Sequence, residues 1–251
     1  MPADRTSPDP RAFRRRLAAG ELLLGTFVKT PTGHATEILG DLGYDFVVID
    51  AEHAPFDRVA TDAALLAAKA ARCASLVRVQ SASPWHLLSA LDCGATGVLV
   101  PHVMTATQAR DVARACRYRH GTRGFSAGTR AGRYGGMSRW ELVDAGDAET
   151  AVIAQIEDPQ ALEDVEAIAR VEGIDALFIG RGDLAVAMNA ANSDAPEILA
   201  ASQRIADAVR AAGKAVAIFA GTLGEVKQLR AMGASVIVYS SDQSFMRAAA
   251  A

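Results

Sequence analysis

Eight short runs rich in Val, Ile, Leu and Phe constrain the fold of this chain more than any other feature of its sequence. Each run is continuous rather than alternating, which is typical of strands buried on both faces of a parallel sheet. The runs cover residues 22–28, 45–50, 75–79, 97–100, 151–156, 175–179, 214–219 and 235–239. Apolar residues at helical spacing occupy the intervals 56–71, 105–117, 158–169, 194–212 and 222–232. This alternation over 251 residues predicts an α/β fold, a (β/α)8 or TIM barrel, with an open doubly wound sheet as the alternative if one strand is misread.

The composition excludes several classes of protein. Lys and Arg (26) nearly balance Asp and Glu (29), so the chain has no basic field that would hold nucleic acid or an anionic membrane. Its three cysteines are scattered and lack zinc-site spacing, which is typical of reduced residues in a cytoplasmic protein. Residues 1–16 contain no apolar core of the kind a signal peptide needs. We therefore expect a cytoplasmic protein in which residues 1–251 form a single barrel domain with a short N-terminal tail.

Polar and charged side chains follow the predicted strands, and they point to a functional site. The carboxyl ends of barrel strands meet at one rim, where the chemistry of such folds is found. Charged groups inside or just beyond apolar strands are costly unless they are paired or bind a metal. The residues at this rim include Asp50, Glu52, His53, Arg78, His102, Gln155, Glu157, Arg181, Gly182 and Asp183.

Glu157 and Asp183 end neighbouring strands, so their carboxylates can converge on one point. Two carboxylates with room for water and substrate oxygens suit a hard cation such as Mg²⁺ or Mn²⁺, with Co²⁺ also compatible. A structural interpretation of each residue remains open, in which Asp183 caps a helix over 184–188 and Glu157 is a first-turn carboxylate before Pro159. The pair on adjacent strand ends favours a metal.

His53 and Arg78 are the candidates for proton transfer and substrate binding. A neutral His53 could accept a proton directly or through water, and Asp50 could fix its tautomer. The alternative is a surface histidine before a helix that starts at Pro55, and His102 on the same rim is the second candidate base. The guanidinium of Arg78 could bind the oxygens of an α-keto acid or form a buried salt bridge to Glu52 or Glu157, and these uses are compatible.

The Gly- and Arg-rich stretch 118–139 is the longest irregular segment of the predicted fold. A loop of this length on a compact barrel is more often an active-site cover than a plain connection. We therefore expect Arg123 and Arg130 to lie near the substrate.

At these residues the chain resembles the HpcH/HpaI family of metal-dependent class II pyruvate aldolases, of the 2,4-dihydroxyhept-2-ene-1,7-dioate aldolase type. The similarity is carried by FVVIDAEHAP (46–55), VRV (77–79), LDCGA (91–95), LVPHV (99–103), QIE (155–157) and LFIGRGDL (177–184), in the order of the family and over nearly the whole chain. It implies a barrel of the phosphoenolpyruvate/pyruvate-domain type. It also implies reversible retro-aldol cleavage of a 4-hydroxy-2-oxoacid to pyruvate and an aldehyde through a metal-bound pyruvate enolate.

The resemblance assigns roles around the metal. Glu157 and Asp183 would be the metal ligands, and Arg78 would contact the keto oxygen of the substrate. Gln155 would contact a metal-bound water or a substrate oxygen. The main-chain amides of Gly182 and Asp183 would bind the substrate carboxylate.

The resemblance also assigns residues outside this centre. His53, held by Asp50, would act as acid and base through a water molecule. Asp92 would reach the site of a neighbouring subunit, since the family forms homohexamers that are trimers of dimers. The chain departs from the family at Arg181-Gly182, where Pro-Ala or Pro-Asn is common, and in having only a short final helix.

Four alternatives stay open at this point. Oxaloacetate decarboxylation and a citrate-lyase-like cleavage of a thioester would use the same enolate, although no obvious basic cluster outside the Arg-rich loop would bind coenzyme A. A non-catalytic barrel that senses a keto acid would not need His53. A Schiff-base mechanism would need a lysine at the rim, and only Lys29 lies there.

Overall fold

The computed structural model describes residues 9–251, and its eight parallel strands close into a barrel in sequence order. The strands are β1 (Leu23–Val28), β2 (Phe46–Asp50), β3 (Ala74–Arg78), β4 (Gly97–Val100), β5 (Ala151–Ile156), β6 (Ala176–Ile179), β7 (Ala215–Ala220) and β8 (Val236–Ser241). β1 pairs with β8, which completes the ring. The predicted (β/α)8 barrel is therefore confirmed, and an open sheet is excluded.

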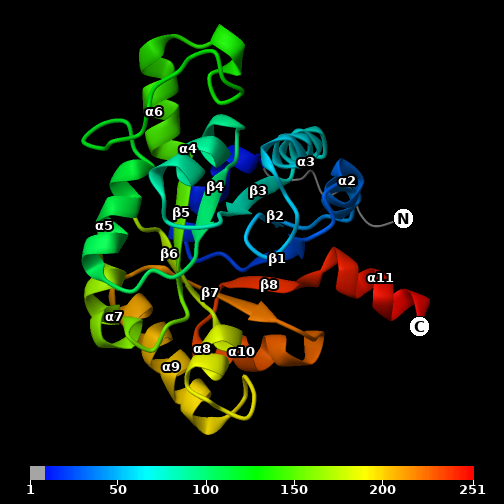
Figure 1. The fold of residues 1–251 in the computed structure, drawn as a ribbon, viewed down its shortest axis with the longest axis vertical. Coiled ribbons are helices and arrows are strands. Elements are labelled where there is room, and N and C mark those ends of the chain that lie inside the picture. The colour runs from blue at the N-terminus through cyan, green and yellow to red at the C-terminus, as the bar shows by residue number, and fades with distance from the viewer. Residues whose placement is uncertain (1–8) are drawn as a thin grey trace.

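Helices surround this barrel (Figure 1). They are α1 (Phe13–Ala18), α2 (Gly33–Asp41), α3 (Arg58–Ala70), α4 (Pro84–Asp92), α5 (Ala106–Ala115), α6 (Arg139–Glu149), α7 (Ala161–Arg170), α8 (Arg181–Ala187), α9 (Pro196–Ala211), α10 (Val226–Met232) and α11 (Asp242–Ala250). Three 3-10 turns, η1 (Pro10–Ala12), η2 (Arg133–Gly135) and η3 (Leu223–Glu225), lie between them. Figure 1 shows α11 extending away from the barrel to the C-terminus. No helix within residues 9–251 has both the length and the apolar character needed to cross a membrane.

The core has two layers because successive strand residues face opposite sides. On β2, Phe46 and Val48 pack inside the barrel, whereas Val47 and Ile49 pack outward against the helices. Both sets are buried, which explains why the strands are continuous apolar runs in the sequence.

The amino-terminal end of the barrel is closed by a helix that lies partly within the expected tail. Phe13 and Leu17 of α1 are buried in the inner core, and the Phe13 ring lies 5.2 Å from the Phe46 ring, centroid to centroid. Residues 13–18 therefore belong to the packed fold and not to the short N-terminal tail that we expect. Residues 1–8 of that tail lie outside the described part of the chain.

Candidate active site at the carboxyl end of the barrel

Strand alternation places four polar residues on the inner face of the barrel. Asp50 follows Phe46 and Val48 in the inward series of β2, and Arg78 follows Leu76 on β3. Gln155 follows Ile153 on β5, and Glu157 continues that series just beyond the strand end. All four are buried, so this end of the barrel interior is polar where the rest is apolar.

Asp50 and Arg78 form a two-point ion pair. Arg78 donates from Nε to Oδ1 of Asp50 at 3.0 Å and from Nη2 to Oδ2 at 2.7 Å. The guanidinium also stacks on the ring of Phe27 at 4.6 Å, and the Nζ of Lys29 lies 3.4 Å from Asp50 Oδ2. Burial alone would raise the pKa of Asp50, but hydrogen bonding and charge from Arg78 lower it. Asp50 is therefore an ionised anchor that fixes the plane of Arg78.

Asp50 also shapes the turn that carries His53. Its Oδ1 accepts hydrogen bonds from the main-chain N–H groups of Glu52 at 3.3 Å and His53 at 3.1 Å. The His53 imidazole is 53% exposed, and its Nε2 lies 3.6 Å from Oε2 of Glu52. We expected Asp50 to fix the imidazole tautomer. In the structure Asp50 instead holds His53 through its backbone, and Glu52 is the carboxylate beside the ring.

Carboxylates crowd the centre of the rim. Glu157 Oε1 accepts a hydrogen bond from the main-chain N–H of His102 at 2.9 Å, and Glu157 Oε2 accepts one from the side-chain amide of Gln155. One ligand atom each from Glu52, His102 and Glu157 lies within 4.8 Å of the others. Burial raises the pKa values of Glu52 and Glu157, and the nearby charge of Asp183 raises them further. This arrangement is a possible metal site of two carboxylates and one imidazole.

His102 is more closely surrounded by acids than its sequence neighbours indicate. Its Nδ1 lies 3.0 Å from Asp158 Oδ2 and 3.5 Å from Glu157 Oε1, and its Nε2 lies 3.7 Å from Glu52 Oε1. Burial would lower the pKa of His102, but the hydrogen bond with Asp158 and these charges raise it. Sequence reasoning missed Asp158 and gave Glu52 only the role of a salt-bridge partner. In the sequence Asp158 directly follows Glu157 and Glu52 directly precedes His53, and this adjacency was the available signal.

Asp183 occupies the first turn of α8, and it is exposed. α8 begins at Arg181 and is preceded by Gly180, so the interpretation of Asp183 as the cap before a helix over 184–188 is wrong. Gly180 permits a close approach, since a Cβ there would lie 2.5 Å from the Glu157 Cβ. A Cβ on Gly182 would meet nothing within 4 Å, which leaves the space beside the Gly182 and Asp183 amides open.

Arg181 joins three segments beside this turn. Its Nη1 lies 2.9 Å from Asp194 Oδ1 and its Nη2 lies 2.9 Å from Glu225 Oε2, while Nη2 also donates to the Phe219 carbonyl at 3.3 Å. The side chain is only 9% exposed. The departure from the family pattern at Arg181 is therefore a buried guanidinium that ties α8 to the end of β7, to η3 and to the connection before α9.

The long loop 118–139 lies at the opposite end of the barrel from this site. Arg123 and Arg130 line a pocket together with Ser75, Thr96 and Thr150, which mark the amino-terminal ends of β3, β4 and β5. The expectation that this loop covers the site of its own barrel is therefore wrong.

Asp92, the last residue of α4, lies at the same far end. Its Oδ1 is buried without a hydrogen-bond partner among the described residues, 3.9 Å from Arg123 Nη2. Asp92 is thus remote from the site of its own barrel.

Comparison with known proteins is consistent with this geometry. The family model for HpcH/HpaI aldolase/citrate lyase matches residues 23–249. A 5-keto-4-deoxy-D-glucarate aldolase from Klebsiella pneumoniae is 33% identical over 242 residues, 96% of this chain and 94% of the relative. A 4-hydroxy-2-oxovalerate aldolase from Rhodococcus jostii is 36% identical over 233 residues, 92% of this chain and 90% of the relative.

Solved structures show the same relationship. An HpcH/HpaI aldolase/citrate lyase family protein from Burkholderia cenocepacia superimposes with a TM-score of 0.91 at 34% identity, covering 96% of each chain. Macrophomate synthase superimposes with a TM-score of 0.85 at 26% identity, covering 96% of this chain and 86% of the other. The chain therefore belongs to the HpcH/HpaI aldolase/citrate lyase family, and it is a carbon–carbon lyase.

Proposed function

We propose that this chain is a divalent-metal-dependent aldolase that reversibly cleaves a 4-hydroxy-2-oxoacid to pyruvate and an aldehyde. One observation carries the proposal. Arg78, fixed by Asp50, faces a group of buried oxygens in which Gln155 Oε1 has no hydrogen-bond partner among residues 9–251. Unpartnered buried oxygens are rare in native proteins and indicate that a ligand completes the site.

The donor set fits a hard cation. Glu157 is buried and Asp183 adds a second carboxylate whose charge acts on it, so oxygen ligands are available for Mg²⁺, Mn²⁺ or Co²⁺. We assign Glu157 and Asp183 as the ligands. Glu52 and His102 are left out of the ligand set because Glu52 already faces Arg78 and His102 already faces Asp158. A cation bound there supplies a Lewis acid next to the keto group of the substrate.

Arg78 binds and orients the substrate in this proposal. Its Nε and Nη2 are occupied by Asp50, whereas Nη1 donates to no group within the described residues. Nη1 is therefore available to donate to the keto oxygen, where negative charge develops during C–C cleavage. Gln155 contacts a cation-bound water through Oε1 or a substrate oxygen through Nε2, and the main-chain amides of Gly182 and Asp183 donate to the substrate carboxylate.

His53 moves the proton. In the cleavage direction it accepts the C4 hydroxyl proton through a water molecule, the C3–C4 bond breaks, and the aldehyde leaves. A proton is then returned to C3 to give the methyl group of pyruvate. The carboxylate beside the His53 ring, Glu52, lies 3.6 Å away, whereas the His102 ring is held by Asp158 at 3.0 Å, so His53 suits this proton exchange with water better than His102.

The assembly and location are also part of the proposal. We infer a homo-oligomer, a hexamer built as a trimer of dimers, in which Asp92 serves the site of a neighbouring subunit. Asp92 Oδ1 has no hydrogen-bond partner among residues 9–251 and lies at the end of the barrel remote from its own site, which supports this role. Three free, buried cysteines support a reducing, cytoplasmic location, and we take residues 1–251 as one barrel domain.

The reaction class can be tested with small molecules alone. The aldolase should release pyruvate from 4-hydroxy-2-oxoacids, lose this activity on thorough chelation and regain it with Mn²⁺, Mg²⁺ or Co²⁺. Oxaloacetate and a citrate-type thioester serve as parallel substrates, because decarboxylation and thioester cleavage could use the same site. Faster turnover of either one than of every 4-hydroxy-2-oxoacid would contradict the aldolase assignment.

A further inference from the structure

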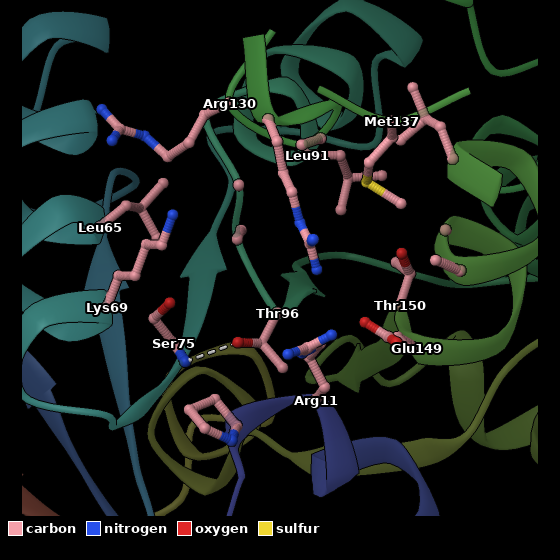
Figure 2. A pocket seen from close by; sticks show the side chains of 18 of the residues that line it. Arg11, Leu65, Lys69, Ser75, Leu91, Thr96, Arg130, Met137, Glu149 and Thr150 are labelled. Carbon is pink, nitrogen blue, oxygen red and sulfur yellow. Dashed lines mark hydrogen bonds between the residues drawn. The ribbon is translucent and has the colours of Figure 1, made fainter. Parts of the chain in front are cut away.

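A cavity separate from the site around Arg78 of the same chain lies at the amino-terminal end of the barrel. It has a volume of about 510 Å³, within the range of small-ligand sites. Figure 2 shows Ser75, Thr96 and Thr150 along its lining, with Arg11 and Lys69 nearby. Because these three hydroxyl residues mark the beginnings of β3, β4 and β5, the cavity and the site around Arg78 lie at opposite ends of the same strands.

The lining of this cavity is strongly cationic. Six basic residues contribute to it, whereas the acidic ones are Asp9 and Glu149. The chain as a whole carries a net charge of -3, so composition does not explain this concentration of positive charge. The basic residues are Arg11, Lys69, Arg72, Arg123, Arg130 and Arg133.

Half of these basic residues lack a carboxylate partner within the described part of the chain. Arg130 pairs with Asp62 at 2.6 Å, and Arg11 lies 3.6 Å from Asp9. Across residues 9–251, no carboxylate lies within 4.0 Å of the basic groups of Lys69, Arg72 or Arg133. Like charges gathered without counter-charges repel one another, and an anion in the cavity would relieve that repulsion.

Arg123 gives independent evidence for a missing ligand. Its side chain is only 2% exposed and stacks on the Tyr118 ring at 4.4 Å. Nevertheless its Nε has no acceptor among the described residues, and its nearest carboxylate atom, Asp92 Oδ1, is 3.9 Å from Nη2. A buried guanidinium with an unused donor is the group that binds carboxylate or phosphate oxygens in proteins.

The backbone also holds two of these arginines in an unfavourable conformation. Arg72 directly follows the last turn of α3 with φ of 53°, and Arg133 begins η2 with φ of 52°. Left-handed backbone favours glycine, so an arginine there keeps a side chain at some conformational cost. Both of these side chains line the cavity.

We propose that the amino-terminal cavity binds a small dianion, of the phosphate or dicarboxylate type, through Lys69, Arg72, Arg123 and Arg133. The guanidinium forks match the paired oxygens of such anions, and the hydroxyls of Ser75, Thr96 and Thr150 provide neutral donors. Since the cavity and the carboxyl-end site of the same chain lie at opposite ends of the strands, one chain can hold the anion and pyruvate at once. The anion is therefore a ligand additional to the substrate of that chain.

The test is isothermal titration of the full chain with inorganic phosphate and, in a second arm, succinate. Mg²⁺ and saturating pyruvate keep the carboxyl-end site filled, and NaCl holds the ionic strength constant. The proposal expects saturable binding of one anion per chain in at least one arm. The anion that binds with the higher affinity, phosphate or succinate, identifies the class of ligand.

Matched variants locate the binding. The double variant Lys69→Met/Arg72→Met should bind the anion with an affinity at least about tenfold lower than the wild type. Arg110 is an exposed cation on α5, and Arg110→Met should leave the affinity unchanged. Lys69 and Arg72 are exposed, so the double variant should fold, which its unfolding temperature without anion checks.

Three results would overturn the proposal. One is the absence of saturable binding of both anions to the wild-type chain. Another is an equal anion affinity in the wild type and the double variant, or a loss of anion affinity in Arg110→Met as large as in the double variant. The third is a change of oligomeric mass in the double variant without anion binding by the wild type, which would assign these cations to contact with another copy of the chain.

Discussion

Asp50 and Arg78 are direct register partners on β2 and β3, and their side chains form a two-point ion pair inside the barrel. The pairing of the strands therefore brings the carboxylate and the guanidinium together without a loop. A side chain positioned in this way loses little freedom when it binds substrate, since its orientation is fixed beforehand.

Arg78→Lys should reduce pyruvate release by about 10²–10³-fold, the usual effect of removing one transition-state donor. Lysine keeps the charge but cannot bind Asp50 at two points and still donate to the substrate. Mn²⁺ affinity, measured by electron paramagnetic resonance, should remain within a few-fold of the wild type. A variant that turns over normally would remove Arg78 from the proposed role.

His53→Ala should lower turnover by about 10²–10⁴-fold while pyruvate binding is retained, since the residue moves a proton and does not hold the ligand. His120→Ala is the matched control because His120 is exposed in the loop at the far end of the barrel. His102→Ala distinguishes the two candidate bases. If His102→Ala abolishes turnover and His53→Ala does not, the base has been assigned to the wrong histidine.

Gly180→Ala should impair the site because the new Cβ would lie 2.5 Å from the Glu157 Cβ and 3.4 Å from Gln155 Nε2. Overpacking of this kind typically costs about 1–3 kcal/mol, here by moving Glu157 away from its position. Gly182→Ala is the control, since nothing lies within 4 Å of its Cβ. The expected result is weaker Mn²⁺ binding in Gly180→Ala only. If both variants bind Mn²⁺ with equal affinity, the position of Glu157 next to Gly180 does not control Mn²⁺ binding and the prediction is wrong.

Arg181→Met should lower the free energy of unfolding by about 1–3 kcal/mol at pH 7, because it leaves Glu225 and the Phe219 carbonyl without their buried donor. Arg204→Met should cost less than about 1 kcal/mol, since its pair with Glu166 is largely exposed. Urea unfolding of both variants measures the difference.

The effect of Arg181→Met should also depend on pH. Burial alone would raise the pKa of Glu225, but hydrogen bonds from Arg181 and Thr222 lower it. A lowered pKa stabilises the fold above the unfolded value of about 4.3, and this contribution disappears as the pH falls through the folded value. The gap between wild type and variant should therefore narrow in acid. A gap that is constant from pH 7 to pH 3 would exclude the ion pair as its cause.

The strands were predictable from the sequence to within one or two residues because both of their faces are buried. β4 (Gly97–Val100) and β5 (Ala151–Ile156) have the bounds that their apolar runs predict. α1 was missed because only Phe13 and Leu17 of its six residues are buried. α6 was missed although Ser138 and Glu141 form a capping box at its start, which was the available signal.

The site was predictable as a set of residues but not as a geometry. Rim position identified Asp50, Arg78, Gln155 and Glu157, yet the sequence did not indicate that Asp50 binds Arg78 and only the backbone of His53. The loop 118–139 was predicted at the wrong end of the barrel, because the prediction used the length of the loop and not its position between secondary-structure elements. Together with α6 it connects α5 to β5, and connections from a helix to the next strand lie at the amino-terminal end of a barrel.

Deuterium uptake into the methyl group of pyruvate tests the central claim most directly. This exchange needs only the proposed cation, Arg78 and a base, so it isolates proton removal from the aldehyde partner. With diamagnetic Mg²⁺, the wild-type chain should exchange the methyl protons of pyruvate for deuterium, seen as loss of the methyl signal in the proton NMR spectrum, and chelation or Arg78→Lys should suppress the exchange. Borohydride added with pyruvate should not inactivate the protein. Exchange that survives complete chelation, together with inactivation by borohydride, would contradict the account and indicate a Schiff-base lysine.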